Sequence, residues 1–321
     1  MGMILAVDGG GSKLSAVLFD DEFRLLGRGM SGGININHTS LENSRDNVMD
    51  CLGQVFGGNP PAHIDRLYVV FIGPVNLLYE ELAKYMTVGE ILPLHEAKAG
   101  LLAGALWEEG ILALAGTGSD IFYVREEKEL NSVVGAWGPI LGDQGSGTWI
   151  GQKALRAVVA SIEGWGEPTM IHELIQREWK LERNWDMVNI IHRSVAPFRK
   201  VASVTPLVGE AARAGDSVAL KILHEAGRIM AVQTDCLIHR RGIPEEYWRV
   251  VCCGGAWKTH PSMFAAYSER LLELYPGITV DKPWFEHVIA GMANEMLRQQ
   301  VPVQQARQRL SEQFPDYIIR W

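Results

Sequence analysis

Glycine-rich segments at three places carry residue types that can hold a phosphate group. The first, DGGGSK, occupies 8–13, and the second, AGTGSD, occupies 115–120, each at the end of an apolar run. Successive glycines let backbone N–H groups approach an anion without obstruction by a Cβ atom. Thr117 and Ser119 add hydroxyl donors to the second segment. The third, CCGGAW at 252–257, is expected to open a helix, whose positive dipole end attracts phosphate.

A carboxylate stands at the start of the first segment and favours a metal-assisted phosphate site. The segment is neither a P-loop nor a dinucleotide fingerprint, because the required spacing is missing and a strand is expected to follow it. An ordinary β-hairpin turn is the alternative. Asp8 lies where a strand should end, a position suited to holding Mg²⁺ directly or through water.

The elements that must position these segments alternate as in mixed sheets covered by helices. Apolar runs predict an antiparallel meander of three strands at 3–8, 14–20 and 24–30. Further strands are expected at 67–73, 111–116, 120–126, 132–137, 248–255 and 278–281. Helices are expected at about 40–56, 76–86, 95–108, over most of 149–241, and at 261–274, 284–299 and 304–314.

The opening pattern of strand, glycine turn and strand occurs twice, which indicates an internal duplication. LAVDGGGS at 5–12 and LALAGTGS at 112–119 share Leu, Ala, Gly, Gly and Ser at equal positions. We therefore expect two related domains, at 1–109 and 110–299, the second with a helical insertion. A C-terminal helix at about 300–321 is expected to pack on the first domain. Two facing phosphate turns predict a nucleotide cleft, and only the first turn has a carboxylate, since Ala115 matches Asp8.

The composition is that of an ordinary globular chain and excludes several classes of protein. The 321 residues are 47% hydrophobic and 21% charged, which suits two domains of usual size. A net charge of −8 has the wrong sign for a nucleic-acid partner. Four cysteines without CxxC spacing predict no zinc site and no disulfide framework. With no basic leader and no long apolar run, we expect a cytoplasmic protein without a membrane partner.

Four segments together resemble the N-acetylglucosamine kinases, which belong to the BadF/BadG/BcrA/BcrD ATPase family of the actin-like ATPase superfamily. They are DGGGSK, GTGS, GAWGPILGDQGSGTWIG at 135–151, and CCGGAWK. The resemblance runs in order up to about residue 295. It implies an α/β fold of two ribonuclease-H-like domains, with mixed sheets flanked by helices and with ATP and Mg²⁺ in the cleft between them. It also implies a homodimer.

The resemblance implies a role for each matching residue. Asp8 corresponds to the magnesium-associated aspartate, which holds the metal through water. ATP-binding residues are implied at Gly9, Gly10, Gly11, Ser12, Lys13, Gly116, Thr117, Gly118, Ser119, Gly254, Gly255 and Ala256. Sugar-binding residues are implied at Asn37, His38, Glu96, Trp137, Gly138 and Asp143. Two of these have simpler alternatives, since Trp137 would also suit core packing and Asn37 would also suit a turn.

Three positions depart from the family pattern. Glu96 stands where the family has an aspartate that serves as catalytic base, Gln144 where glutamate is common, and Asp120 where asparagine is familiar. Glutamate is longer by one methylene, and a misplacement of about 1 Å costs on the order of 100-fold in rate. Alternatively, Glu96 is only a favourable charge at a helix N-terminus. Gln144 implies an altered sugar preference, and the charge of Asp120 is unfavourable near phosphate unless it points away or pairs with a base.

The glycine turns and nearby carboxylates predict a phosphate-binding cleft, and the resemblance implies in-line transfer of the γ-phosphoryl group of ATP to the 6-hydroxyl of an amino sugar, with Glu96 as candidate base. N-acetylglucosamine, glucosamine and N-acetylmuramic acid stay open as substrates. The alternative is an ATP- and sugar-binding paralogue that acts as a sensor or regulatory ATPase with little kinase activity. An electron-transfer activator is disfavoured, because Cys252 and Cys253 should point to opposite faces of one strand and cannot jointly hold an iron–sulfur cluster.

Overall fold

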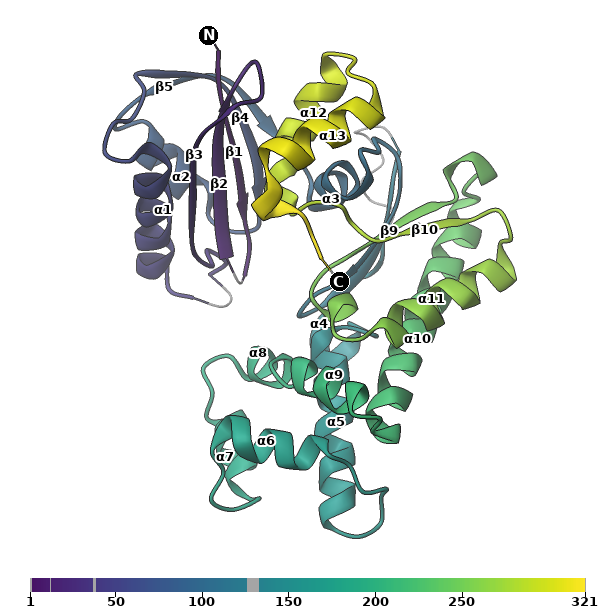
Figure 1. The fold of residues 1–321 in the computed structure, drawn as a ribbon. Coiled ribbons are helices and arrows are strands. Elements are labelled where there is room, and N and C mark those ends of the chain that lie inside the picture. Colours follow the sequence, from purple (N-terminus) through teal and green to yellow (C-terminus); the bar gives the residue numbers. More distant parts are fainter. Residues whose placement is uncertain (1, 12, 37–38, 126–132, 321) are drawn as a thin grey trace. The chain divides into compact units, whose positions relative to one another are not determined.

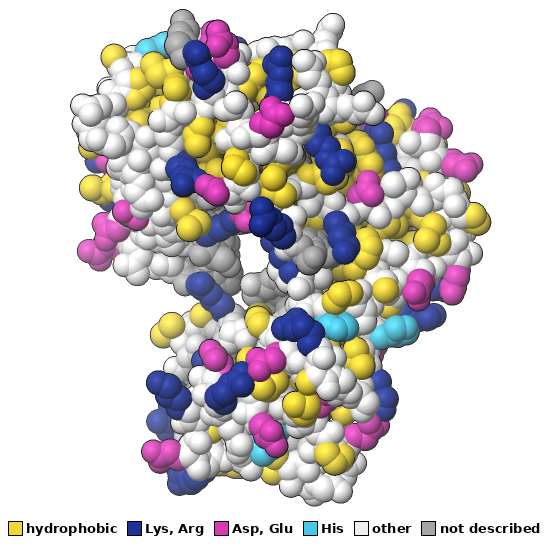
Figure 2. All heavy atoms as spheres, in the orientation of Figure 1, with side chains coloured by type: hydrophobic (Ala, Val, Ile, Leu, Met, Phe, Trp, Pro, Cys, Tyr) yellow, Lys and Arg dark blue, Asp and Glu magenta, His cyan; other side chains and the backbone are white. Residues whose placement is uncertain are grey.

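The chain divides into two compact units, each described by itself (Figure 1). The computed structural model describes residues 2–11, 13–36, 39–125 and 133–320. Unit 1 comprises Met1–Glu108 and Pro283–Arg320, and unit 2 comprises Glu109–Lys282. In the described part of the chain, no helix is both long and apolar enough to cross a membrane. Basic and acidic side chains are interspersed on the face that Figure 2 shows.

Unit 1 is built on one mixed sheet. Its elements are β1 (Met3–Gly9), β2 (Lys13–Asp20), β3 (Leu25–Gly32), α1 (Leu41–Phe56), β4 (His63–Phe71), α2 (Val75–Leu82), β5 (Thr87–Pro93), α3 (Glu96–Ala105), η4 (His287–Ile289), α12 (Ala290–Arg298), α13 (Val303–Gln313) and η5 (Pro315–Tyr317). The strand order is β3-β2-β1-β4-β5. The first three strands pair antiparallel, and β4 and β5 continue the sheet parallel to β1.

Both faces of this sheet are buried, which explains the uninterrupted apolar run of β1. Leu5 and Val7 pack in the cluster with residues of α1 and α2. Ile4 and Ala6 point to the other face, where α3, α12 and α13 pack. Because helices cover both faces of this central strand, none of the positions in the middle of the strand faces solvent. Its sequence is therefore continuously apolar there.

Unit 2 repeats the sheet of unit 1 and adds helices. Its elements are β6 (Gly110–Ala115), β7 (Ser119–Val124), β8 (Val133–Gly135), α4 (Gly138–Leu141), α5 (Gly147–Ile162), α6 (Ile171–Trp179), α7 (Asp186–His192), α8 (Pro197–Ala202), α9 (Thr205–Arg213), α10 (Ser217–Arg241), η2 (Glu245–Tyr247), β9 (Arg249–Cys253), η3 (Ala256–Lys258), α11 (Pro261–Leu274) and β10 (Thr279–Asp281). The strand order is β10-β9-β6-β7-β8.

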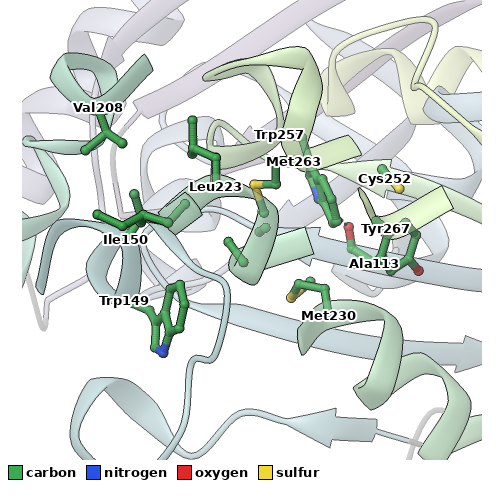
Figure 3. Packing of buried hydrophobic residues seen from close by; sticks show 14 of the residues in the cluster. Ala113, Trp149, Ile150, Val208, Leu223, Met230, Cys252, Trp257, Met263 and Tyr267 are labelled. Carbon is green, nitrogen blue, oxygen red and sulfur yellow. Dashed lines mark hydrogen bonds between the residues drawn. The ribbon is translucent and has the colours of Figure 1, made fainter. Parts of the chain in front are cut away.

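The two sheets have the same topology. In unit 2, β6, β7 and β8 pair antiparallel, and β9 and β10 extend the sheet parallel to β6. This matches unit 1 strand for strand, as the internal duplication predicts. One large apolar cluster joins the sheet to α5, α6, α9, α10 and α11, and Figure 3 shows its centre around Met230, Trp257 and Tyr267. Helices α10 and α11 lie side by side along it (Figure 1).

The expected fold class, two mixed sheets flanked by helices, is confirmed, with two differences in detail. Strand β5 was not expected, because its side chains are mostly exposed and give no apolar alternation. Residues 284–299 lie in unit 1, whereas the sequence predicts them in the second domain. Buried contacts hold them there: the Tyr68 hydroxyl donates to Glu295 Oε2 at 2.8 Å, and Arg66 Nε lies 3.3 Å from the same oxygen.

Helix α1 lies unusually close to β3, and this generates a stability prediction. A Cβ atom on Gly27 would lie 2.1 Å from the backbone oxygen of Val55, which cannot move aside alone. We expect Gly27→Ala to lower the free energy of unfolding by about 1–3 kcal/mol through overpacking. The unfolding midpoint of the full chain measures this.

A matched control lies on the same helix. A Cβ atom on Gly53 of α1 meets no atom within 4 Å, so Gly53→Ala should raise stability by about 0.5–1 kcal/mol. Equal midpoints for the two variants would contradict the close approach of α1 to β3.

Candidate functional site

Asp8 and Glu96 lie at the same edge of the sheet in unit 1. Strands β1, β4 and β5 are parallel, so their carboxyl ends meet at one edge. Asp8 is opposite Val70 in register, near the end of β1, and Glu96 begins the helix that follows β5. By strand alternation, Asp8 shares a face with Ala6, and that is the face that α3 covers. The fold therefore brings both predicted carboxylates to one corner of unit 1.

The environment of Asp8 includes residues from the far end of the chain. Burial raises the pKa of Asp8 above its ordinary value, while the charges of His287 and Lys13 lower it and Glu286 raises it. Lys13, which follows the first glycine turn, forms an ion pair with Glu286. Sequence reasoning missed Glu286 and His287, because no local pattern links them to a turn almost 280 residues earlier.

Glu96 is held by an unusual helix cap. His95 is the N-cap of α3, and its Nδ1 accepts the N–H of Ala97 at 3.1 Å. Burial lowers the pKa of His95, which favours the neutral imidazole that this cap requires. The cap fixes the first turn of α3 and with it the half-buried Glu96. This placement suits a catalytic base and equally suits a favourable charge at a helix N-terminus.

The second glycine turn, at 116–119, is bonded to the start of α5 in unit 2. The N–H of Gly147 donates to the carbonyl of Gly116 at 2.8 Å. Thr148 donates to the carbonyl of Thr117 through both its N–H, at 3.1 Å, and its hydroxyl, at 2.7 Å. Ser119 Oγ donates to the backbone oxygen of Gln144 at 2.9 Å. The second glycine turn is thus hydrogen-bonded to residues 144–148, which belong to the segment 135–151 that resembles the N-acetylglucosamine kinases.

The third glycine turn packs against the second. Gly254 has φ +112°, and a Cβ atom there would lie 2.3 Å from the carbonyl oxygen of Ala115. Trp257, just after it, is fully buried and donates its indole N–H to the carbonyl of Ala113 at 3.0 Å. Figure 3 shows the two residues close together. Only glycine permits this approach, which sets the turn of β9 beside the turn of β6.

Asp143 lies over the second turn and Trp137 lies at the surface. Asp143 is 7% exposed, and a Cβ atom on Gly118 would lie 3.0 Å from its Oδ2. Burial raises the pKa of Asp143, while hydrogen bonds from the backbone of Ser119 and Gly138 lower it. Trp137 is 71% exposed, so the alternative of Trp137 as a core residue is wrong.

The loop between β8 and α5 is strained where it holds these residues. Ala136 and Asp143 have φ values of +61° and +56°, in the left-handed region that non-glycine residues rarely adopt. Such conformations cost of the order of 1–3 kcal/mol each and cluster at binding and active sites. The bonds from Ser119 and Gly138 to Asp143 help to hold the loop in this form.

The predicted residues thus form two groups, one on each unit. Unit 1 brings together Asp8, Gly9, Gly10, Gly11, Lys13 and Glu96, and unit 2 brings together Gly116, Thr117, Gly118, Ser119, Trp137, Gly138, Asp143, Gly254, Gly255 and Ala256. Ser12, Asn37 and His38 lie outside the described residues, so their roles stay predictions. Among the described residues, no three His, Cys, Asp or Glu side chains are grouped so that they could hold a metal ion.

Known proteins with similar sequences are sugar kinases by name. The N-acetylmuramic acid/N-acetylglucosamine kinase of Clostridium acetobutylicum is 26% identical over 292 residues, which cover 87% of this chain and 94% of that one. The N-acetyl-D-glucosamine kinase of Dictyostelium discoideum is 24% identical over 303 residues, covering 87% and 92%.

A solved structure and a family model agree with these relatives. The structure comes from Chromobacterium violaceum and is proposed to be an N-acetylglucosamine kinase. Its TM-score is 0.67 at 20% identity, and the match covers 92% of this chain and 99% of that one, which shows a common fold. The family model matches residues 5–280. Because that match spans most of its length, the chain belongs to the BadF/BadG/BcrA/BcrD ATPase family.

Proposed function

We propose that the chain is an ATP-dependent kinase that transfers the γ-phosphoryl group to the 6-hydroxyl of an amino sugar. One observation carries the proposal: each unit ends a buried central strand in a glycine turn, and carboxylates lie beside both turns. Phosphoryl transfer needs little covalent help from the protein and depends on positioning and charge stabilisation, which such turns supply. The similarity to kinases named for amino sugars supports the substrate class.

In this proposal the glycine turns and Lys13 hold the phosphates of ATP. Backbone N–H groups of the first and second turns bind phosphate oxygens, and the Lys13 ammonium adds a point charge. Lys13 forms an ion pair with Glu286, with which a phosphate would compete for the ammonium group. The third turn, at 254–256, packs on the second and would contact the adenosine.

Asp8 fits a magnesium ion that keeps most of its own water. Mg²⁺ is commonly bound by one or two carboxylates together with water and substrate phosphates. Asp8 is a partly buried carboxylate, and desolvation raises its pKa, so a cation beside it would relieve the cost of its charge. When bound there, the metal would supply charge neutralisation on the phosphates.

Glu96, Asp143 and Trp137 are assigned to the sugar. Glu96 would accept the proton of the attacking hydroxyl, as a carboxylate held on a rigid helix end can do. Asp143 would accept hydrogen bonds from sugar hydroxyls, and the exposed indole of Trp137 offers an apolar surface to the ring.

The first test is coupled ADP release with Mg·ATP and a panel of glucosamine, N-acetylglucosamine, N-acetylmuramic acid, N-acetylmannosamine and glucose. We expect at least one amino sugar to stimulate turnover, and Glu96→Gln to lower kcat by about 10²–10⁴-fold, since general base catalysis is worth that much. The matched control is Glu42→Gln, which removes a glutamate from the first turn of α1. Equal effects of the two variants would show that Glu96 is only a helix-terminal charge, and ATP binding without sugar-stimulated turnover would favour a sensor or regulatory ATPase.

A second prediction concerns the phosphate turn. Lys13→Gln should raise KM for ATP by about tenfold or more, because a charged hydrogen bond to phosphate is lost, and should change KM for the sugar much less. Steady-state kinetics with each substrate varied separately measure this split. Lys180→Gln, at an exposed lysine after α6, serves as control, and parallel rises in both KM values would count against the assignment.

The homodimer implied by the family resemblance stays a prediction. Light scattering coupled to size-exclusion chromatography of the full chain checks it, and a mass of one chain, 35.6 kDa, would contradict it.

A further inference from the structure

The ion pair between Lys13 and Glu286 joins the first glycine turn to the C-terminal part of unit 1. Lys13 begins β2 directly after that turn, and its carbonyl accepts the N–H of Gly10 at 3.0 Å, which closes the turn. Its ammonium group donates to Glu286 Oε2. The side chains of Lys13 and Glu286 are 42% and 33% exposed, so a solute can reach both charged groups.

Glu286 is held in place by its own backbone and by that of its neighbour. Its N–H donates to the carbonyl of Tyr317 at 3.0 Å. Phe285, directly before it, is 1% exposed and donates its N–H to the carbonyl of Ala103, in α3, at 3.1 Å. Because this backbone is already fixed, less conformational freedom is lost when the carboxylate pairs with Lys13.

The ammonium group of Lys13 cannot serve this carboxylate and a phosphate group equally well. It has three N–H donors, but a phosphate that shares it brings a second negative charge close to the carboxylate. Like charges at such a separation repel, so a bound phosphate favours an ammonium group that has left Glu286. The ion pair therefore opposes phosphate binding. The alternative is that Glu286 orients the ammonium group toward the phosphate and so strengthens binding.

We propose that Glu286 is a positioning residue that holds the ammonium group of Lys13 and releases it when a nucleotide phosphate binds, so that Glu286 lowers the affinity for nucleotide. The proposal rests on the proposed function, which makes the first glycine turn a phosphate site. It adds a regulation of that site, because a weaker hold on nucleotide speeds the dissociation of the product ADP. Glu286 acts through Lys13 in this scheme and touches no substrate.

The test measures the dissociation constant of ADP by calorimetric titration of the full chain in buffer that contains Mg²⁺. We expect Glu286→Gln to lower this constant by about two- to fivefold, the range for an ion pair whose side chains are partly exposed. Glutamine keeps the size of the side chain and removes only its charge.

A matched control lies in the same part of unit 1. Asp316 of η5 pairs with Arg28 of β3, so this ion pair also joins the first three strands to the C-terminal segment. Asp316→Asn removes a carboxylate charge there and should leave the dissociation constant of ADP unchanged.

A double-variant cycle shows whether Glu286 acts through Lys13. In the Lys13→Gln chain, Glu286→Gln should have no further effect on ADP binding, because no ammonium group is left to release. A structural role of Glu286, or direct repulsion between its charge and the nucleotide, would change the dissociation constant in both backgrounds. Equal effects in the two backgrounds, no effect in either, or weaker ADP binding by Glu286→Gln alone would overturn the inference.

ADP binding is measured without a sugar, which keeps this inference distinguishable from the proposed function. If no sugar is phosphorylated but Glu286→Gln tightens ADP binding only where Lys13 is present, the kinase proposal fails and the role of Glu286 stands. If a sugar is phosphorylated and Glu286→Gln leaves ADP binding unchanged, the kinase stands and the role of Glu286 fails. If the chain does not bind ADP, both fail.

Discussion

The structure depends on one constraint that occurs in both units: a central strand buried on both faces has to end at a sheet edge in a turn made almost entirely of backbone. In β1 and β6 every interior position is apolar because helices or further structure cover each side. Chemistry is therefore confined to the end of the strand. Glycine lets that end bend back into an antiparallel strand and leaves no Cβ atom to obstruct the approach of an anion to the backbone. The duplicated sheets place such an end in each unit.

Buried polar contacts decide which parts of the chain share a corner with these turns. The C-terminal segment returns to unit 1. There Glu295, which is only 3% exposed, accepts a hydrogen bond from the hydroxyl group of Tyr68. Breaking such a buried group from its partners leaves an unsatisfied charge, so the contact fixes the register of α12 on the sheet. Helix α12 follows directly from η4, and the same packing carries Glu286 and His287 to Asp8. A structural network thus determines the electrostatics of a candidate site.

Four carboxylates with shifted pKa values have two kinds of surroundings. Asp20 is fully buried, and although burial acts to raise its pKa, hydrogen bonds from Arg24 and from the backbone of Glu22 lower it below its ordinary value. Asp20 is therefore a turn residue whose carboxylate charge is compensated by its hydrogen bonds. Asp8, Asp120 and Asp143 lie beside the glycine turns, and burial outweighs their partners and raises the pKa of each. Groups left incompletely compensated in this way are typical of sites that meet a ligand.

The sequence by itself determined the duplicated meander, the glycine turns and the candidate carboxylate Asp8, because strand alternation, apolar runs and motif spacing are local properties. Glu96 and Asp143 became candidates only through the resemblance to the N-acetylglucosamine kinases. The sequence did not reveal β5, whose exposed edge lacks an apolar pattern, or the exposure of Trp137. Only the tertiary structure decided that residues 284–299 join the first unit and that Glu286 meets Lys13. These are contacts between residues far apart in the chain, and their energies depend on burial and on neighbouring charge, which exist only once the sheets and helices have packed.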